Sequence, residues 1–209
     1  GDSSLSEVSV GSVRSKLGLP DESVLVLYTG TFEAYQGLDL LLASVRLVIK
    51  EEPNTKFVLV GGRTDQVEMI KKQAQEAGVE GAMVFTGQLS SKEIPTFLDA
   101  ADALVSPRST GWNTPLKIYQ YLRSGKPIVA TRLLTHTQVL NDDVAVLTGA
   151  TSEEYAEGLI RVIRDPSYGR EIGKRAKKLA ETKYTYEAYL NRTRMSYAAL
   201  FEDTSDLDQ

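Results

Sequence analysis

Six short apolar runs constrain the fold of this 209-residue chain more than any other feature of its sequence. Each run is almost continuously apolar instead of alternating with polar residues, which is typical of strands covered on both faces of a sheet. The runs are VLVLYTG (24–30), FVLVG (57–61), MVFTG (83–87), ALVS (103–106), PIVAT (127–131) and VAVLT (144–148). Because connections of about ten residues or more separate them, we expect the strands to pair in parallel.

The segments between these runs have the apolar spacing of helices that pack on a sheet. Such spacing extends over 38–49 and over 67–77, and Ser90 and Glu93 form a capping-box pattern ahead of a third helix. Further helices are expected after the last run, over 151–182 and 186–201. The sequence therefore predicts an α/β fold, a Rossmann-like doubly wound sheet of about six parallel strands with helices on both faces.

Composition excludes several classes of protein. A formal net charge of −4 gives no electrostatic reason to bind nucleic acid, and the absence of cysteine excludes disulfide scaffolds and thiol nucleophiles. With His136 as the single histidine, multi-histidine metal sites are excluded. No apolar run approaches the roughly 20 residues of a transmembrane segment. We expect one cytoplasmic domain over 1–209, loose at 1–10 and 203–209, and the absence of an initiating methionine suggests part of a longer polypeptide.

Ligands of open α/β sheets bind outside the carboxyl ends of the strands, so the loops that follow the predicted strands are the candidate site. Glycines recur there, as in Gly30, Gly61-Gly62 and Gly87, and they allow a close approach of backbone to ligand. Neither a G-x-G-x-x-G fingerprint nor a Walker P-loop is present, which disfavours a nicotinamide dehydrogenase or an NTPase. Tight turns between strands and helices are an equally good explanation of these glycines.

The loop after the fourth run carries a helix start and a cation. Thr114 fits the N-cap and Pro115 the first helical position, which places Lys117 in the first turn, where the helix dipole disfavours a positive charge. That lysine is either solvated or the partner of a bound anion. Arg63 and Arg108 lie on neighbouring loops, so the three cations suggest a phosphate-bearing ligand. Scattered surface charges remain the alternative.

Longer segments of the sequence give a more specific indication of function. The stretch SPRSTGWNTPLKIYQYLRSGKPIVAT (106–131) resembles the donor-binding segment of retaining glycosyltransferases of the GT-B fold, family 4 type, through Pro115, Lys117, Tyr121 and Gly125-x-Pro127. YTGTFEAYQGLDLLLAS (28–44) and FVLVGG (57–62) are similar to the first loop and second strand of the same domain. The resemblance covers about 11–200. It implies the C-terminal, nucleotide-sugar-binding half of such an enzyme, with the N-terminal acceptor-binding domain absent from this chain.

Four residues depart from the family pattern. Trp112 and Gln120 stand where the family has two glutamates, and Thr31 and Gln36 stand where its first loop has an arginine and a lysine. Gln120 retains the capacity to hydrogen-bond a ribose, whereas Trp112 lacks a carboxylate. A non-catalytic nucleotide- or sugar-binding module is therefore an alternative, and a flavodoxin-like or epimerase-like domain is a third, favoured by fold alone.

The resemblance implies two sets of contacts to a nucleotide-diphosphate sugar. The diphosphate and ribose would be bound by Gly30, Thr31, Gln36, Gly62, Arg63, Arg108, Asn113, Thr114, Pro115, Lys117 and Gln120. The base or the sugar would be flanked by Gln88, Leu89, Trp112 and His136. For His136 a capping or surface role is the alternative, and for Trp112 a cover over the sheet edge. The catalytic residues would be completed by the absent domain, through which the protein could lie at the inner membrane.

No metal or cofactor is expected, because these cations and backbone N–H groups would stabilise the leaving diphosphate. The carboxylates of Asp142 and Asp143 are explained as a solvated turn, since no third ligand is spaced nearby.

Overall fold

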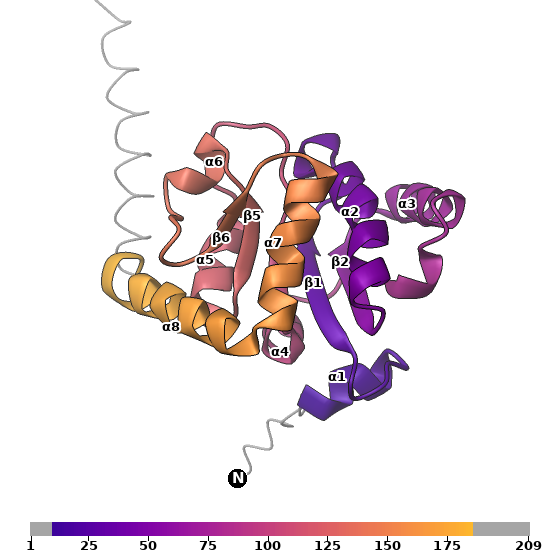
Figure 1. The fold of residues 1–209 in the computed structure, drawn as a ribbon, viewed down its shortest axis with the longest axis horizontal. Coiled ribbons are helices and arrows are strands. Elements are labelled where there is room, and N and C mark those ends of the chain that lie inside the picture. Colours follow the sequence, from indigo (N-terminus) through magenta and orange to yellow (C-terminus); the bar gives the residue numbers. More distant parts are fainter. Residues whose placement is uncertain (1–9, 186–209) are drawn as a thin grey trace, which may run out of the picture.

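The computed structural model describes residues 10–185 and forms one parallel sheet with helices on both sides (Figure 1). All strand pairs are parallel, in the order β3-β2-β1-β4-β5-β6. The strands are β1 (Val24–Gly30), β2 (Thr55–Gly61), β3 (Met83–Gly87), β4 (Ala103–Ser106), β5 (Ile128–Thr131) and β6 (Val146–Thr148). The predicted Rossmann-like fold is confirmed. The strand order reverses between β1 and β4, so the crevice that such folds use for ligands lies at the carboxyl ends of these two strands.

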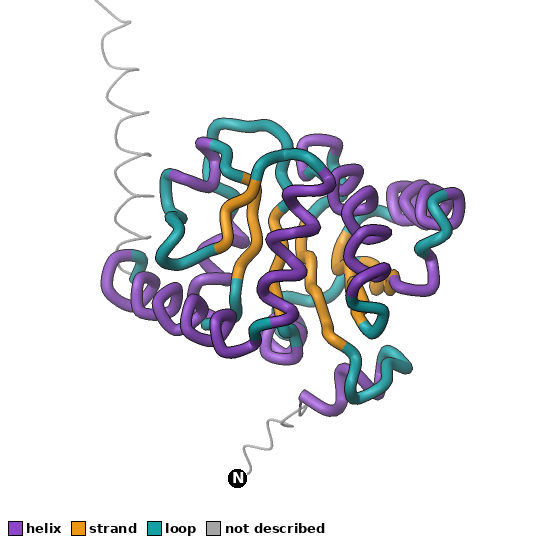
Figure 2. Tube along the Cα trace, in the orientation of Figure 1, coloured by secondary structure: helices purple, strands orange, loops and turns teal. Residues whose placement is uncertain are grey.

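Helices cover both faces of the sheet, as Figures 1 and 2 show. On one face α2 packs beside α7, and on the other lie α4 and α5. The helices are α1 (Val10–Lys16), α2 (Leu38–Glu51), α3 (Thr64–Glu76), α4 (Ile94–Ala100), α5 (Leu116–Ser124), α6 (Leu134–Thr137), α7 (Ser152–Arg164) and α8 (Pro166–Lys183). Short 3-10 helices lie at Ala34–Gln36 and Glu80–Ala82.

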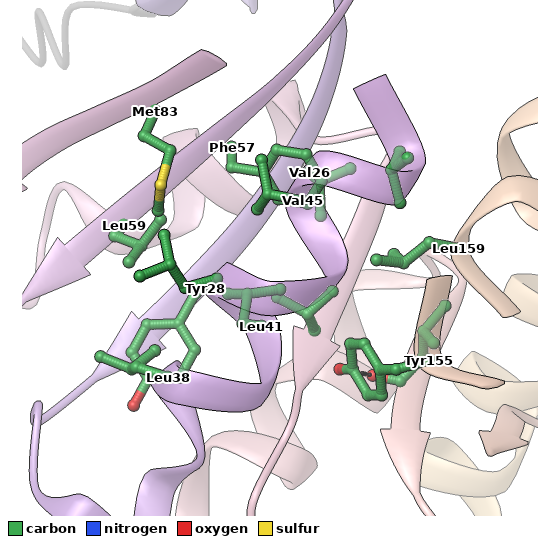
Figure 3. Packing of buried hydrophobic residues seen from close by; sticks show 14 of the residues in the cluster. Val26, Tyr28, Leu38, Leu41, Val45, Phe57, Leu59, Met83, Tyr155 and Leu159 are labelled. Carbon is green, nitrogen blue, oxygen red and sulfur yellow. Dashed lines mark hydrogen bonds between the residues drawn. The ribbon is translucent and has the colours of Figure 1, made fainter. Parts of the chain in front are cut away.

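Alternate side chains of each inner strand enter opposite cores. From β1, Val26 and Tyr28 enter the core under α2 and α7, whereas Leu25 and Leu27 enter the one under α4 and α5. Figure 3 shows the first core, where the β1 residues meet Leu41 and Val45 of α2 together with Phe57 and Leu59 of β2. This two-sided burial is the physical reason for the continuous apolar runs in the sequence.

Several element boundaries differ from the sequence predictions or were left open by them. The last run is a strand only from Val146, because the N–H groups of Val144 and Ala145 donate to the carbonyl of Asn141 in a turn. Glu93 accepts hydrogen bonds from the N–H and hydroxyl of Ser90 as predicted, but the helix begins later, at Ile94. The stretch 151–182 divides into two helices at Asp165, whose side chain caps α8 ahead of a proline. The predicted helix over 186–201 lies outside the described residues, as do the ends expected to be loose, 1–10 and 203–209, except for Val10, which is the first residue of α1.

Candidate functional site

Two adjacent strand ends form the floor of a cavity. Gly30 and Gly61 are register partners at the ends of β1 and β2, and a Cβ on Gly61 would lie 1.9 Å from the Gly30 carbonyl oxygen. Only glycine allows this approach, since Gly61 also has a φ of +116°. The cavity has a volume of about 340 Å³. Its lining includes six of the predicted site residues, namely Gly30, Thr31, Gly62, Arg63, Gln88 and Leu89.

One wall of this cavity is a hydrogen-bonded cluster of Glu33, Arg63 and Gln66. The Glu33 carboxylate accepts from Arg63 Nη1 at 2.9 Å and from Gln66 Nε2 at 3.0 Å. These two hydrogen bonds, that from Gln66 first, lower the pKa of Glu33. Arg63 also lies 3.4 Å from Asp65. Arg63 therefore lines the cavity, but two carboxylates already compensate its charge. This compensation was not predicted from the sequence.

The two predicted site residues of the loop after β1, Thr31 and Gln36, contact each other. Gln36 is buried, and its Nε2 donates to Thr31 Oγ1 at 3.2 Å. The Thr31 carbonyl accepts a hydrogen bond from the Tyr28 hydroxyl at 2.6 Å. Thr31 lines the cavity. Gln36 does not line it, and instead supports the loop through its hydrogen bond to Thr31.

Helix α5 begins one residue later than predicted. Pro115 is its N-cap, with φ −61° and ψ 136°, and no side chain caps the helix. The assignments of Thr114 as N-cap and Pro115 as first helical residue are wrong, because the proline ring fixes φ at a value that helical and extended backbone share. Lys117 still lies in the first turn, as expected. The Ile118 N–H donates to the Pro115 carbonyl at 3.0 Å, so the N–H groups of Leu116 and Lys117 are the ones at the start of α5 without a partner within the helix.

The side chain of Lys117 is the least compensated cation at the site. Its stem is partly exposed, but Nζ is buried and has no hydrogen-bond partner. Nζ lies 3.8 Å from the centroid of the Tyr28 ring, and a Cβ on Gly30 would be 3.1 Å from it. Burial, and secondarily the positive charge of Arg108, lowers the pKa of Lys117 to about 7. The alternative of a solvated lysine is wrong, because the strand end and tyrosine ring enclose the amine.

The Arg108 side chain forms hydrogen bonds within its own loop, which precedes α5. Its Nε donates to the Thr110 carbonyl at 2.9 Å and its Nη1 to the Asn113 carbonyl at 3.1 Å, while the guanidinium lies 4.9 Å from the Tyr35 ring centroid. These contacts hold the loop that leads into α5. Arg108 is near enough to Lys117 to lower the pKa of that lysine, so two of the three predicted cations come together.

Gln120 and Trp112 lie further out. Gln120 is exposed on α5 and lines a second hollow of about 260 Å³ between α4 and α5, and Ile94 lines both this hollow and the first cavity. The Trp112 side chain is 80% exposed, and its carbonyl accepts from Gln138 Nε2 at 2.8 Å. A tryptophan so exposed does not cover the sheet edge, so that alternative is wrong.

His136 is completely buried on α6, which contradicts the surface role considered for it. Its Nδ1 lies 2.7 Å from the Thr131 carbonyl and its Nε2 lies 2.9 Å from Ser106 Oγ. Since a carbonyl only accepts, Nδ1 carries the proton and Nε2 accepts from the serine hydroxyl. Burial lowers the pKa of His136 to about 4. The neutral ring connects the ends of β4 and β5 through these two hydrogen bonds. Ser106 and Thr131, polar residues at the ends of two apolar strands, were the feature of the sequence that could have predicted the burial of His136.

Within residues 10–185, no three acidic or histidine side chains come together in a group that could hold a metal ion. Asp142, expected in a solvated turn, forms an ion pair with Arg132 at 2.6 Å, and this contact lowers the pKa of the aspartate. The same part of the chain contains no helix long and apolar enough to cross a bilayer.

Residues 11–179 match the family described as glycosyl transferases group 1. The chain belongs to this family. Among curated relatives it is 24% identical over 200 residues to the putative glycosyltransferase YtcC of Bacillus subtilis, covering 90% of this chain and 48% of that one. It is 29% identical over 126 residues to the alpha-monoglucosyldiacylglycerol synthase of Streptococcus pneumoniae, covering 60% of this chain and 28% of the synthase.

Several solved structures share the fold of this chain. Anabaena HepE in complex with UDP-glucose superposes with a TM-score of 0.80 at 19% identity, over 91% of this chain and 52% of HepE. The C-terminal domain of the group 1 protein LpcC from Francisella tularensis has a TM-score of 0.71 at 20% identity, over 82% of this chain and 91% of that domain. The fold is thus that of the C-terminal half of a GT-B glycosyltransferase, and the chain spans about half the length of YtcC.

Proposed function

We propose that this chain is the nucleotide-sugar-binding half of a retaining glycosyltransferase, which transfers a sugar from a nucleotide-diphosphate donor to an acceptor bound by a second domain. One observation carries the proposal: a buried amine without a partner, Lys117 Nζ, lies beneath the glycine strand end that lines a cavity of about 340 Å³. A site of this kind suits an anion. Membership of the glycosyltransferase family and the UDP-glucose complex of HepE favour a nucleotide diphosphate as that anion.

The chemistry follows from the charge that develops on the leaving diphosphate as the glycosidic bond breaks. Preorganised donors that face this charge lower the barrier. In the proposed complex, Lys117 and the free N–H groups at the start of α5 face the diphosphate, and Arg108 holds the loop before the helix. These groups supply positive charge without a divalent metal.

The remaining predicted contacts divide between the two hollows. Gln88 and Leu89 line the first cavity and would flank the base, while Gln120 in the adjoining hollow would contact the ribose. His136 has no exposed surface, so we assign it no contact with the sugar. It supports the site through Thr131, whose hydroxyl donates to the Arg108 carbonyl at 2.6 Å.

Titration of UDP, GDP and ADP into the 209-residue protein, followed by their sugar conjugates, tests the proposal. We expect one of the three diphosphates to bind, and EDTA to change its Kd by less than about twofold. Lys117→Met should weaken binding by about 1.5–3 kcal/mol, the range for a hydrogen bond to a charged group. Lys50→Met is the matched control, because Lys50 is exposed in the last turn of α2. Failure of all three nucleotides to bind would refute the proposed site.

A non-catalytic nucleotide-binding module is the second candidate, and the neutral Trp112 and Gln120 favour it. Both functions predict nucleotide binding, so binding alone does not separate them. Donor hydrolysis or transfer by this chain joined to an acceptor-binding domain separates them. Turnover with retained anomeric configuration in the NMR spectrum of the product supports the transferase, and donor binding without turnover supports the module.

A further inference from the structure

The amine of Lys117 is enclosed by groups that offer it no negative charge. The ring of Tyr28 from β1 faces it at 3.8 Å, Arg108 approaches from the loop before α5, and His136 faces it from α6. Tyr121, one turn further along α5, directs its hydroxyl to Thr29, whose N–H donates to it at 2.9 Å. In the part of the chain that the structure describes, no carboxylate oxygen lies within 4.0 Å of Lys117 Nζ.

None of these neighbours is able to supply the missing charge by ionising. The Tyr28 hydroxyl donates to the Thr31 carbonyl, and burial raises the pKa of Tyr28 well above its usual range. His136 donates its single ring N–H to the Thr131 carbonyl, and burial, which lowers its pKa, keeps the ring neutral. The attraction of the tyrosine ring for a cation is real, but it is smaller than the cost of removing an ammonium from water. The empty site therefore favours a neutral amine, and this agrees with a lysine pKa lowered to about 7.

A bound diphosphate would reverse this balance. The amine lies under Gly30, and Gly30 lines the cavity, so an anion at the strand end would approach Nζ beside the Tyr28 hydroxyl, which would lie 3.2 Å from a Cβ on Gly30. Negative charge at short range in a site of low polarity favours the protonated form of a neighbouring base.

We propose that one proton is taken up from solvent onto Lys117 Nζ when a nucleoside diphosphate binds. The lone pair of the neutral amine forms the new N–H bond, and the resulting ammonium donates to a phosphate oxygen. This inference rests on the proposed donor site and adds the proton as a second ligand of that site. Diphosphate affinity then falls as the pH rises, because the proton becomes scarcer while the phosphate groups themselves stay fully ionised above their second pKa of about 6.

Calorimetric titration of the 209-residue protein tests the proposal, using whichever of UDP, GDP and ADP binds. At pH 8, runs in two buffers of different ionisation enthalpy should report an uptake of close to one proton per diphosphate. Kd should rise by about three- to fivefold from pH 7 to pH 8, since half of the free amine is still protonated at pH 7, and it should rise further from pH 8 to pH 9. In Lys117→Met both signals should disappear, leaving weaker and pH-independent binding, whereas Lys50→Met should behave as the parent.

Binding without proton uptake, and with a Kd that is constant from pH 7 to pH 9, overturns the inference and leaves the proposed donor site intact. Uptake that persists in Lys117→Met assigns the proton to another group and also overturns it. Absence of binding by all three nucleotides from pH 6 to pH 9 overturns the donor site and the inference together. Thermal melts of both variants show whether each is folded before titration.

Discussion

Replacing Lys117 with methionine is expected to stabilise the unliganded protein. The lysine amine is buried without a hydrogen-bond partner, and its pKa falls from 10.5 to about 7. A decrease of that size corresponds to a destabilisation of about 5 kcal/mol, since each pKa unit is worth about 1.4 kcal/mol. This value is a ceiling, because a flexible lysine stem can move its charged end towards water. Methionine has a similar length, carries no charge and can pack against the Tyr28 ring.

The effect depends on pH with a definite sign. Below pH 7 the amine is protonated in both the folded and the unfolded state, so the full cost is present. Between pH 7 and about pH 10 the folded state has lost the proton that the unfolded state still holds, and the parent protein gains stability as the pH rises. Above that range both states are neutral and the cost disappears. The advantage of Lys117→Met should therefore be largest at pH 7 and small at pH 10.

Urea denaturation followed by circular dichroism at pH 7, 8, 9 and 10 measures this difference, because contributions from distant titrating groups cancel between the two proteins. At pH 7 we expect the variant to be more stable by between about 1 and 5 kcal/mol, or at least about 2–4 °C in Tm for a chain of this size. Lys50→Met serves as the exposed control and should show no such trend. A variant less stable than the parent at pH 7, or a difference that is the same at every pH, would refute the reasoning.

Three further outcomes are expected. Gly61→Ala should lower the free energy of unfolding by more than about 3 kcal/mol in a urea titration, since its Cβ would overlap the Gly30 carbonyl at a positive φ, while Gly81→Ala, with open space around it, should change it little. Asp102→Ala should cost about 1–3 kcal/mol in the same assay, because its carboxylate accepts the Leu25 N–H at 2.8 Å. In a radiolabelled-donor assay, the 209-residue chain alone should show no transfer above background.

The fold was predictable from the sequence because burial on both faces of the sheet leaves a continuous apolar run in each strand. Parallel strands between two helical layers must be apolar on both faces, and Val26 and Leu27 of β1 are buried in opposite cores. The start of the last strand was harder to place, since the turn that shortens it depends on hydrogen bonds to Asn141. Apolar spacing carries no information about such contacts.

The candidate site was predictable only in part, because loops bring together residues whose charges depend on partners distant in the sequence. Glycines and Lys117 could be placed from the strand and helix pattern alone. The pairing of Arg63 with Glu33, thirty residues away, could not, and it removes a cation from the expected set. Nor could the hydrogen bond of the buried His136 on α6 to Ser106 at the end of β4, thirty residues earlier. Sequence reasoning thus located the crevice but not its charge balance.

The charge balance suggests how this chain can bind a diphosphate with Thr31 and Gln36 in its first loop. A cation at the exposed position of Thr31 would be screened by solvent, whereas Gln36 is buried beside it. Lys117 instead comes from the opposite side of the crevice, and Tyr28 holds both its amine and the Thr31 carbonyl of the loop. One tyrosine therefore connects the loop to the helix that carries the charge. A buried amine costs stability while the site is empty. In the proposed complex a bound diphosphate would remove that cost, so the same lysine that weakens the unliganded fold would strengthen the complex.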